Sequence, residues 1–363
     1  MPDDALAFMP LRVQNLRCFV RMTMLSKLRS AINFLMELSD IFINDAGRLR
    51  SGWRFAIFVA VYLLLFFLIT GVFQAVLYFS PRAIRQAVSG DYASEFISAA
   101  IFFLIAAIAG LICNGFLEEL PWRALGWAFY SGWTRDLLFG ILIGSLSLLL
   151  ATGIAASGGG LRFALNSSAL FQPVIKNILS SLAVFVPAAA AEEMLFRGYP
   201  LQTFTRAKLA WLGLFLTSVP FALLHLRNPN VVPVFTFINT ALAGVWLATA
   251  YLRTRSLWLP LGIHFSWNWM MNSFMGIPVS GITKFAPAPL FRAIDSGPAW
   301  LTGGDYGLEG GAACTIALLI STLFIWRARF FQPSEEMLRL TDRENPKLKS
   351  SISIYEQHGV DNQ

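Results

Sequence analysis

The sequence predicts an all-α fold, a polytopic transmembrane helical bundle, and three observations carry that prediction. Of the 363 residues, 56% are hydrophobic and only 13% are charged, and the mean hydropathy is +0.59. Soluble domains carry about 25% charged residues, and a soluble core of this length could not cover so many apolar side chains. Runs of about 20 apolar residues, enough to cross about 30 Å of hydrocarbon, recur along the chain. The bilayer is therefore the expected solvent for most of the chain.

Apolar runs bounded by charges, glycine or proline define the expected spans. There are eight of them, near residues 55–79, 96–116, 136–156, 174–195, 208–226, 231–251, 256–274 and 311–327. The residues after the fourth run stay largely apolar, so we expect that helix to continue toward Phe204.

Lysine and arginine predict the orientation of these spans. If the N-terminus is cytoplasmic, 21 of the 28 Lys and Arg residues fall in cytoplasmic segments. The positive-inside rule then places both termini in the cytoplasm. The same distribution explains the net charge of +7 without a nucleic-acid partner, because the basic residues are spread between spans rather than clustered with aromatics.

The spans divide the chain into three regions. Residues 1–54 form a basic segment, in which residues 11–37 suit a helix lying on an anionic leaflet. Residues 55–331 form the membrane domain, with an outside connection at 275–310 that we expect to be irregular, and residues 332–363 form a polar cytoplasmic tail. We therefore expect a multi-pass integral protein in contact with membrane lipids, in the inner membrane of a bacterium or the endoplasmic reticulum of a eukaryote.

Ionisable residues inside the spans are the candidates for function, because each is costly in the membrane unless it is paired or functional. In the sequence AAAAEEMLFRG, Glu193 and Arg197 are four residues apart and are expected to pair on one helix face. Glu192 points about 100° away from that face and has no such partner. A lone carboxylate in an apolar helix suits the role of general base.

Two of the three histidines also lie in apolar runs. His225 ends the fifth run, and His264 and Asn268 are four residues apart in the seventh, so their side chains share a helix face. With a hairpin turn near Ala207, Glu192 and His225 are expected at similar depths, whereas His264 needs a tilted or displaced seventh helix to reach them. These side chains are the predicted site.

A second Glu-Glu-x-x-x-Arg sequence runs from Glu118 to Arg123. Pro121 interrupts any helix there, and the sequence lies at a membrane boundary. We therefore expect interfacial salt bridging and no catalytic role.

At the predicted site the sequence resembles the CPBP family, the type II CAAX prenyl endopeptidases together with bacteriocin-processing and Abi-like membrane proteins. The motifs are EEMLFR (192–197), FALLH (221–225) and HFSWN (264–268), within a core at about 174–275. The resemblance implies an intramembrane endopeptidase of the glutamate type. Its implied substrate is a membrane-associated peptide or protein, with or without a lipid group.

The resemblance also implies a role for each motif residue. Glu192 and His225 would activate a water molecule, and His264 and Asn268 would stabilise the oxyanion. Structural support is expected from Glu193, Arg197 and Phe221. No cofactor is favoured. The alternative is a zinc protease with Glu192, His225 and His264 as ligands, since two histidines and one glutamate form a possible catalytic zinc set.

Two other function classes compete with proteolysis. The first is a non-catalytic membrane scaffold or immunity factor of the same fold, in which the motif residues are structural. The second is a proton-coupled transporter that uses Glu192 and the histidines as a relay. The transporter is less favoured because corresponding halves of the chain lack paired helices broken by glycine or proline.

Overall fold

A computed structural model describes residues 40–44, 47–166 and 171–341 of the protein. The helix expected within residues 11–37 and the tail beyond residue 341 lie outside the described residues. Contacts divide the chain into two units, Met1–Trp53 and Arg54–Gln363. The helical bundle described below belongs to the second unit.

Every predicted apolar run is helical, which confirms the all-α prediction. The eight corresponding helices are α2 (Ser51–Phe79), α4 (Asp91–Glu118), α5 (Trp133–Ser157), α6 (Phe171–Phe196), α8 (Ala210–His225), α9 (Pro233–Thr254), α10 (Trp258–Trp269) and α12 (Ala312–Arg327). The shorter helices are α3 (Arg82–Val88), α7 (Tyr199–Arg206), α11 (Ala299–Thr302) and α13 (Glu335–Thr341).

The protein is an integral membrane protein by the length and composition of these helices. Within the described residues, five helical segments are long and apolar enough to cross a membrane: α2, α4, α5, the segment Gln172–Arg206 and α9. Helices α8 and α12 are apolar but shorter. The number of spans and the cytoplasmic termini stay predictions.

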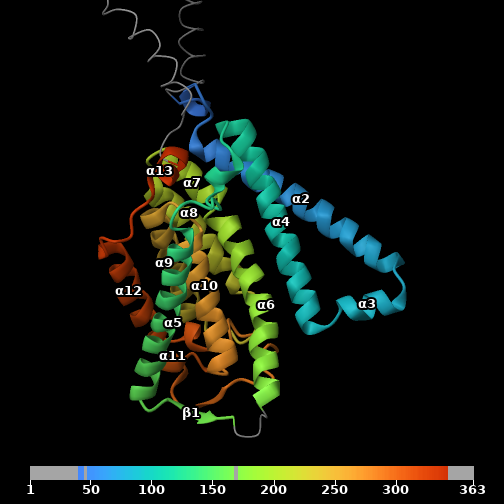
Figure 1. The fold of residues 1–363 in the computed structure, drawn as a ribbon, viewed down its shortest axis with the longest axis vertical. Coiled ribbons are helices and arrows are strands. Elements are labelled where there is room, and N and C mark those ends of the chain that lie inside the picture. Colours follow the sequence, from blue (N-terminus) through green and yellow to red (C-terminus); the bar gives the residue numbers. More distant parts are fainter. Residues whose placement is uncertain (1–39, 45–46, 167–170, 342–363) are drawn as a thin grey trace, which may run out of the picture. The chain divides into compact units, whose positions relative to one another are not determined.

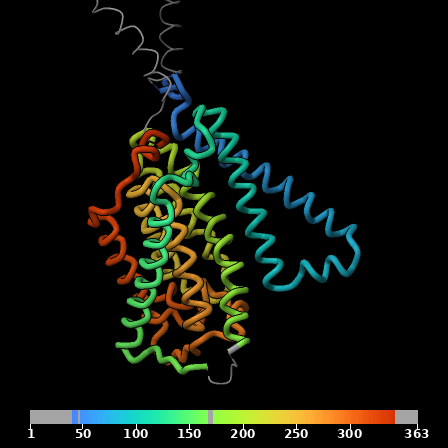
Figure 2. Tube along the Cα trace, viewed as in Figure 1, coloured from blue at the N-terminus to red at the C-terminus, as the bar shows by residue number. Residues whose placement is uncertain are grey.

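Helix α10 lies in the centre of the bundle. In Figures 1 and 2 it runs beside α5, α6 and α9, and its residues 259–267 are all buried. Glycines let α5 approach its backbone: a Cβ atom on Gly140 would lie 2.4 Å from the Leu259 carbonyl oxygen, and one on Gly144 would lie 2.3 Å from that of Ile263. Backbone contact between α5 and α10 therefore fixes the helix that carries His264 and Asn268.

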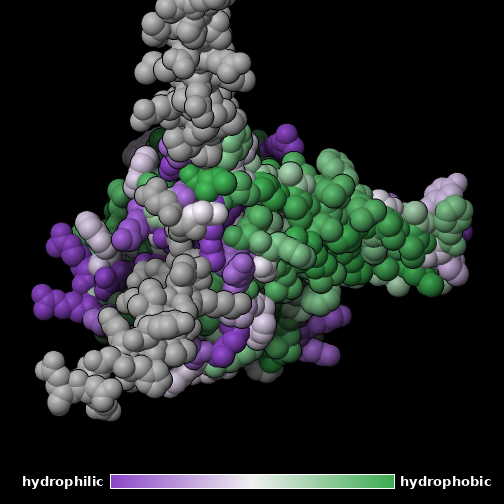
Figure 3. All heavy atoms as spheres, turned by 90° about the horizontal axis from the view of Figure 1, so that it is seen from above, coloured by the Kyte–Doolittle hydropathy of each residue, from purple (hydrophilic) through white to green (hydrophobic). Residues whose placement is uncertain are grey.

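Helix α2 is the apolar helix that the bundle covers least. Only 6% of the most apolar 18-residue stretch of α2 is buried, against 50% of the corresponding stretch of α9. Figure 3 shows an almost continuous hydrophobic surface over the part of the molecule where α2 extends from the bundle. Such a surface fits contact with lipid chains.

The connection at 275–310 is more ordered than the sequence predicted. Strand β2 (Phe291–Asp295) pairs antiparallel with β1 (Leu161–Leu165), and 275–310 also holds α11 and two short 3₁₀ turns. Glu309 ties this connection to the bundle. Its Oε2 accepts hydrogen bonds from the Ser280 N–H and hydroxyl, both at 2.7 Å, and its Oε1 accepts one from the Trp267 indole at 3.2 Å.

The predicted polar tail, residues 332–363, contains a short helix near its start, α13. Helix α13 buries Met337 completely, in a cluster with Ala128 and Tyr130 from the connection before α5. This packing places the segment after α12 beside the start of α5.

Candidate active site

Both motif glutamates lie in the last turn of α6, where the helix stops abruptly. The N–H groups of Arg197 and Gly198 both donate to the Glu193 carbonyl, at 2.8 and 3.0 Å. A Cβ atom on Gly198 would lie 2.2 Å from the Met194 carbonyl oxygen, so only glycine fits this break. The chain then resumes as α7 at Tyr199. The sequence Arg-Gly thus ends one helix and leaves the Arg197 side chain inside the bundle.

Glu193 and Arg197 form the predicted ion pair. The Arg197 Nη1 lies 3.0 Å from Glu193 Oε1, and both side chains are completely buried. The Nη2 group of Arg197 donates to the Gly244 carbonyl at 3.2 Å, and the guanidinium carbon lies 4.9 Å from the centre of the Phe221 ring. The buried charge therefore has a carboxylate, a carbonyl and an aromatic face as partners.

Glu193 has a second partner that the sequence did not indicate. Its Oε1 lies 2.8 Å from Nδ1 of His264, which is 71 residues away in the chain. Because a carboxylate accepts hydrogen bonds, this contact places a proton on Nδ1 and turns Nε2 toward Glu192. The distance from Nε2 to Glu192 Oε2 is 3.6 Å. The imidazole thus lies between two carboxylates.

Glu192 differs from its neighbour in exposure and in partners. Its side chain is 37% exposed, whereas that of Glu193 is completely buried. The Oε2 atom of Glu192 has no hydrogen-bond partner among the described residues. The Glu192 carboxylate is therefore partly accessible, and its buried Oε2 faces His264 without a hydrogen bond.

His225 approaches the same region from the end of α8. Its Nδ1 lies 2.8 Å from the Phe221 carbonyl oxygen, so Nδ1 carries a proton and Nε2 is left free. The buried Phe221 ring separates the two imidazoles, with ring centres 4.6 Å from His225 and 6.3 Å from His264. Phe221 therefore contacts both histidines as well as Arg197.

Asn268 is half-buried one helical turn after His264 on α10. One further turn along, the chain forms a π-helix over Met270–Phe274, in which Asn272 is completely buried. The structure thus brings Glu192, Glu193 and His264 together and places His225 across Phe221 from them.

The second Glu-Glu-x-x-x-Arg sequence takes part in salt bridges, as expected, but its partners lie on other elements. Glu118 is completely buried, 3.1 Å from Arg54 Nη1 and 2.7 Å from Arg206 Nε. Arg123 pairs instead with Glu336 of α13. A left-handed backbone at Glu119 ends α4 and turns the following residues away from Glu118.

The candidate zinc ligands do not form a ligand set in this arrangement. Within the described parts of the chain, no group of three or more His, Cys, Asp or Glu side chains is placed to hold a metal ion. The Nδ1 atoms of His264 and His225 contact Glu193 and a backbone carbonyl, and these contacts leave Nε2 of each ring available as a ligand or as a proton carrier.

Comparison with known proteins supports the resemblance that the three motifs predicted. Residues 174–270 match the family model described as "Type II CAAX prenyl endopeptidase Rce1-like", and this range contains every candidate site residue. An "Uncharacterized 24.3 kDa protein" of Escherichia coli is 34% identical over 90 residues. That alignment covers 24% of this chain and 40% of the relative.

Proposed function

We propose that the protein is an intramembrane endopeptidase of the CPBP family. The match of residues 174–270 to the Rce1-like type II CAAX prenyl endopeptidase model supports this proposal. The protein hydrolyses a peptide bond of a membrane-associated peptide or protein. The observation that carries the proposal is the accessible Glu192 carboxylate beside His264, whose orientation a buried glutamate fixes.

In the proposed reaction, Glu192 and His225 activate the attacking water. The water oxygen bonds to the carbonyl carbon of the scissile peptide while its proton passes to the Glu192 carboxylate. His225 assists through Nε2, the nitrogen left free by the contact of Nδ1 with the Phe221 carbonyl. The C–N bond then breaks, and the proton moves to the leaving nitrogen.

His264 and Asn268 are proposed to stabilise the oxyanion. Asn268 donates through its amide nitrogen. Since Glu193 accepts the proton of Nδ1, His264 donates to the oxyanion when Nε2 also carries a proton. Glu193 is then a positioning residue, because it orients His264 without touching the substrate.

The proposed substrate is a peptide presented at the cytoplasmic half of the membrane. The positive-inside distribution predicts that side for the end of α6, and the matching family's description names prenylated CAAX sequences. A peptide with a lipidated C-terminal cysteine motif is therefore the first substrate to test. The proposed mechanism needs no metal ion.

The test is cleavage by the purified full-length protein. Fluorogenic peptides with a farnesylated CAAX terminus and their unlipidated counterparts are incubated with wild type, Glu192→Ala and His225→Ala. Glu335→Gln is a matched control, because Glu335 is highly exposed on α13. Cleavage by wild type and the control, with loss of about 100-fold or more in both site variants, is the expected result. Equal cleavage by all four proteins would refute the proposal.

A further inference from the structure

A cavity of about 460 Å³ lies at the end of the bundle where α5 begins and α12 ends. One wall comes from the start of α5 and the residues before it, including Ser131 and Arg135. The other comes from the segment after α12, including Arg329, Phe330 and Ser334. We call it the Arg135–Arg329 pocket. It contains none of the proposed catalytic residues.

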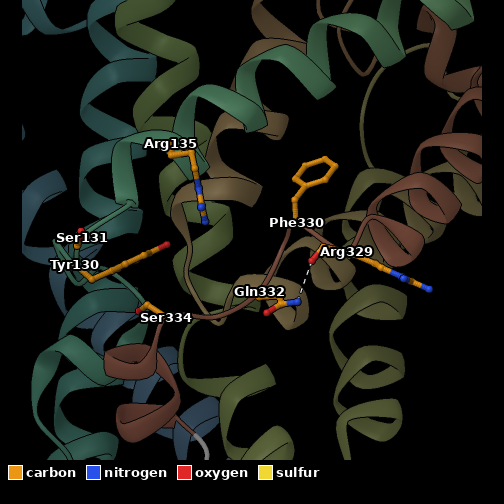
Figure 4. Close-up of a pocket in the computed structure, with 7 residues that line it drawn as sticks. All are labelled: Tyr130, Ser131, Arg135, Arg329, Phe330, Gln332 and Ser334. Atoms are coloured by element: carbon orange, nitrogen blue, oxygen red, sulfur yellow. Dashed lines mark hydrogen bonds between the residues drawn. The ribbon is translucent and has the colours of Figure 1, made fainter.

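Hydrogen-bond donors line this pocket. In Figure 4 the Arg135 side chain points into it, and Arg329 extends outward from the opposite rim. The hydroxyls of Ser131 and Ser334 lie on the two walls. Helix α5 also begins here, after Gly132 and without a side-chain cap, so its first turn adds the positive end of a helix dipole.

The acidic side chain in the first turn of α5 pairs with Arg135 and leaves the charge of Arg329 in excess. Asp136 is buried, accepts a hydrogen bond from Tyr130 and lies 3.3 Å from Arg135 Nη2. Burial and the hydrogen bond to Asp136 raise the pKa of Tyr130, so this phenol stays protonated as the donor to Asp136. Asp136 is thus buried beside Arg135. The charge of Arg329 then gives the pocket a net positive charge.

The surroundings add further positive charge. Arg253 donates to the Ala328 carbonyl at 2.7 Å, and Arg327 lies 5.6 Å from the Trp326 ring centre, so both lie near the segment that carries Arg329. The acids of α13 are engaged elsewhere: Glu335 pairs with Arg339 and Glu336 pairs with Arg123.

Exposed apolar side chains adjoin the polar pocket. Phe330 is 52% exposed and contacts Phe139 of α5 and Phe324 of α12, with ring centres at 5.6 and 6.2 Å. Leu138 and Trp326 are also exposed on these two helices. A soluble anion would use only the polar pocket, whereas a lipid would use both the pocket and this apolar surface.

We propose that the Arg135–Arg329 pocket binds the phosphate headgroup of an anionic phospholipid. Arg135 and the hydroxyls of Ser131 and Ser334 donate to the phosphate oxygens, and Arg329 adds charge at the rim. The acyl chains lie along the exposed apolar faces of α5 and α12.

Lipid binding to the full-length protein tests this assignment independently of proteolysis. Native mass spectrometry in mild detergent measures the affinity for phosphatidylglycerol and for phosphatidylcholine with the same acyl chains. We expect tighter binding of phosphatidylglycerol, weakened about fivefold by Arg135→Gln or Arg329→Gln and about 25-fold by both. Lys208→Gln, an exposed lysine in the α7–α8 connection, is the matched control and should leave the affinity unchanged.

Three results would overturn the proposal. The double variant could bind phosphatidylglycerol as tightly as wild type, or the two lipids could bind equally well. Inorganic phosphate could bind with an affinity that the two arginine variants reduce while phosphatidylglycerol does not bind, which would assign the pocket to a soluble anion. If Arg135→Gln unfolds because Asp136 loses its partner, Arg329→Gln still decides, since Arg329 is exposed and its side chain points outward.

Discussion

Glu193 contacts both Arg197 and His264, and a set of variants separates the two contacts. Glu193→Leu leaves the completely buried Arg197 guanidinium without its carboxylate. Removing one partner of a buried ion pair costs about 3–5 kcal/mol of stability. Replacing both partners with apolar residues of similar size is close to neutral, so the double variant Glu193→Leu/Arg197→Met should regain stability to within about 1 kcal/mol of wild type.

Activity should not return with stability. In the double variant the acceptor for Nδ1 of His264 is still missing, so the ring is no longer held with Nε2 toward Glu192. We expect activity per folded molecule to stay at least about 100-fold below wild type. The single variant Arg197→Met is the opposite case: it is destabilised, but its folded molecules keep the contact between Glu193 and His264 and hence part of their activity.

Two measurements, of stability and of activity, are made on these variants. Thermal unfolding is followed by a thiol-reactive dye, because Cys113 and Cys314 are buried and react once the protein unfolds. A Cys18→Ser background removes the remaining thiol. Cleavage of the peptide substrate is then normalised to the folded fraction. If the double variant regains both stability and activity, Glu193 serves only as an ion-pair partner, and the orienting role assigned to it is wrong.

Three further predictions follow from the same geometry. Glu192→Gln should lower peptide cleavage by about 100-fold or more while changing stability by less than about 1 kcal/mol, because this side chain is partly exposed and has a free oxygen; a large loss of stability in the dye assay would contradict this. Gly144→Ala should cost about 1–3 kcal/mol, because its Cβ would overlap the Ile263 carbonyl, whereas Gly153→Ala on the same helix has open space and should not destabilise. Activity should survive treatment with a strong chelator and removal of bound metal; a loss that zinc alone restores would show that the metal-free mechanism is wrong.

Local patterns predicted the helices and part of the site. Apolar runs place the eight longest helices because the hydrophobicity of a membrane span is a property of consecutive residues. The ion pair between Glu193 and Arg197 follows from four-residue spacing on one helix, and so does the shared face of His264 and Asn268. Glu192 was identified by the absence of a partner at that spacing.

Such local patterns could not predict contacts between segments that are far apart in the sequence. The hydrogen bond from His264 to Glu193 depends on how α10 is placed against α6, and close contact with the glycines of α5 sets that placement. Counting about 1.5 Å per residue predicted different depths for His264 and Glu192. That count gives neither the tilt of α10 nor the point where α10 enters the bundle. The pairing of β1 with β2 and the packing of α13 likewise join segments far apart in sequence.

The contacts of the two histidines define the hydrogen-bonding character of the site before any substrate is present. Each ring is held at Nδ1, His225 by a backbone carbonyl and His264 by a carboxylate, so both present Nε2. The backbone contact of His225 involves no partner side chain, and no substitution elsewhere in the chain can remove it chemically. The tautomer of one histidine is therefore a property of helix geometry, and that of the other depends on a single replaceable residue. The orientation of His225 on α8 should therefore survive side-chain substitutions elsewhere in the chain. The orientation of His264 on α10 should be lost when Glu193 is replaced.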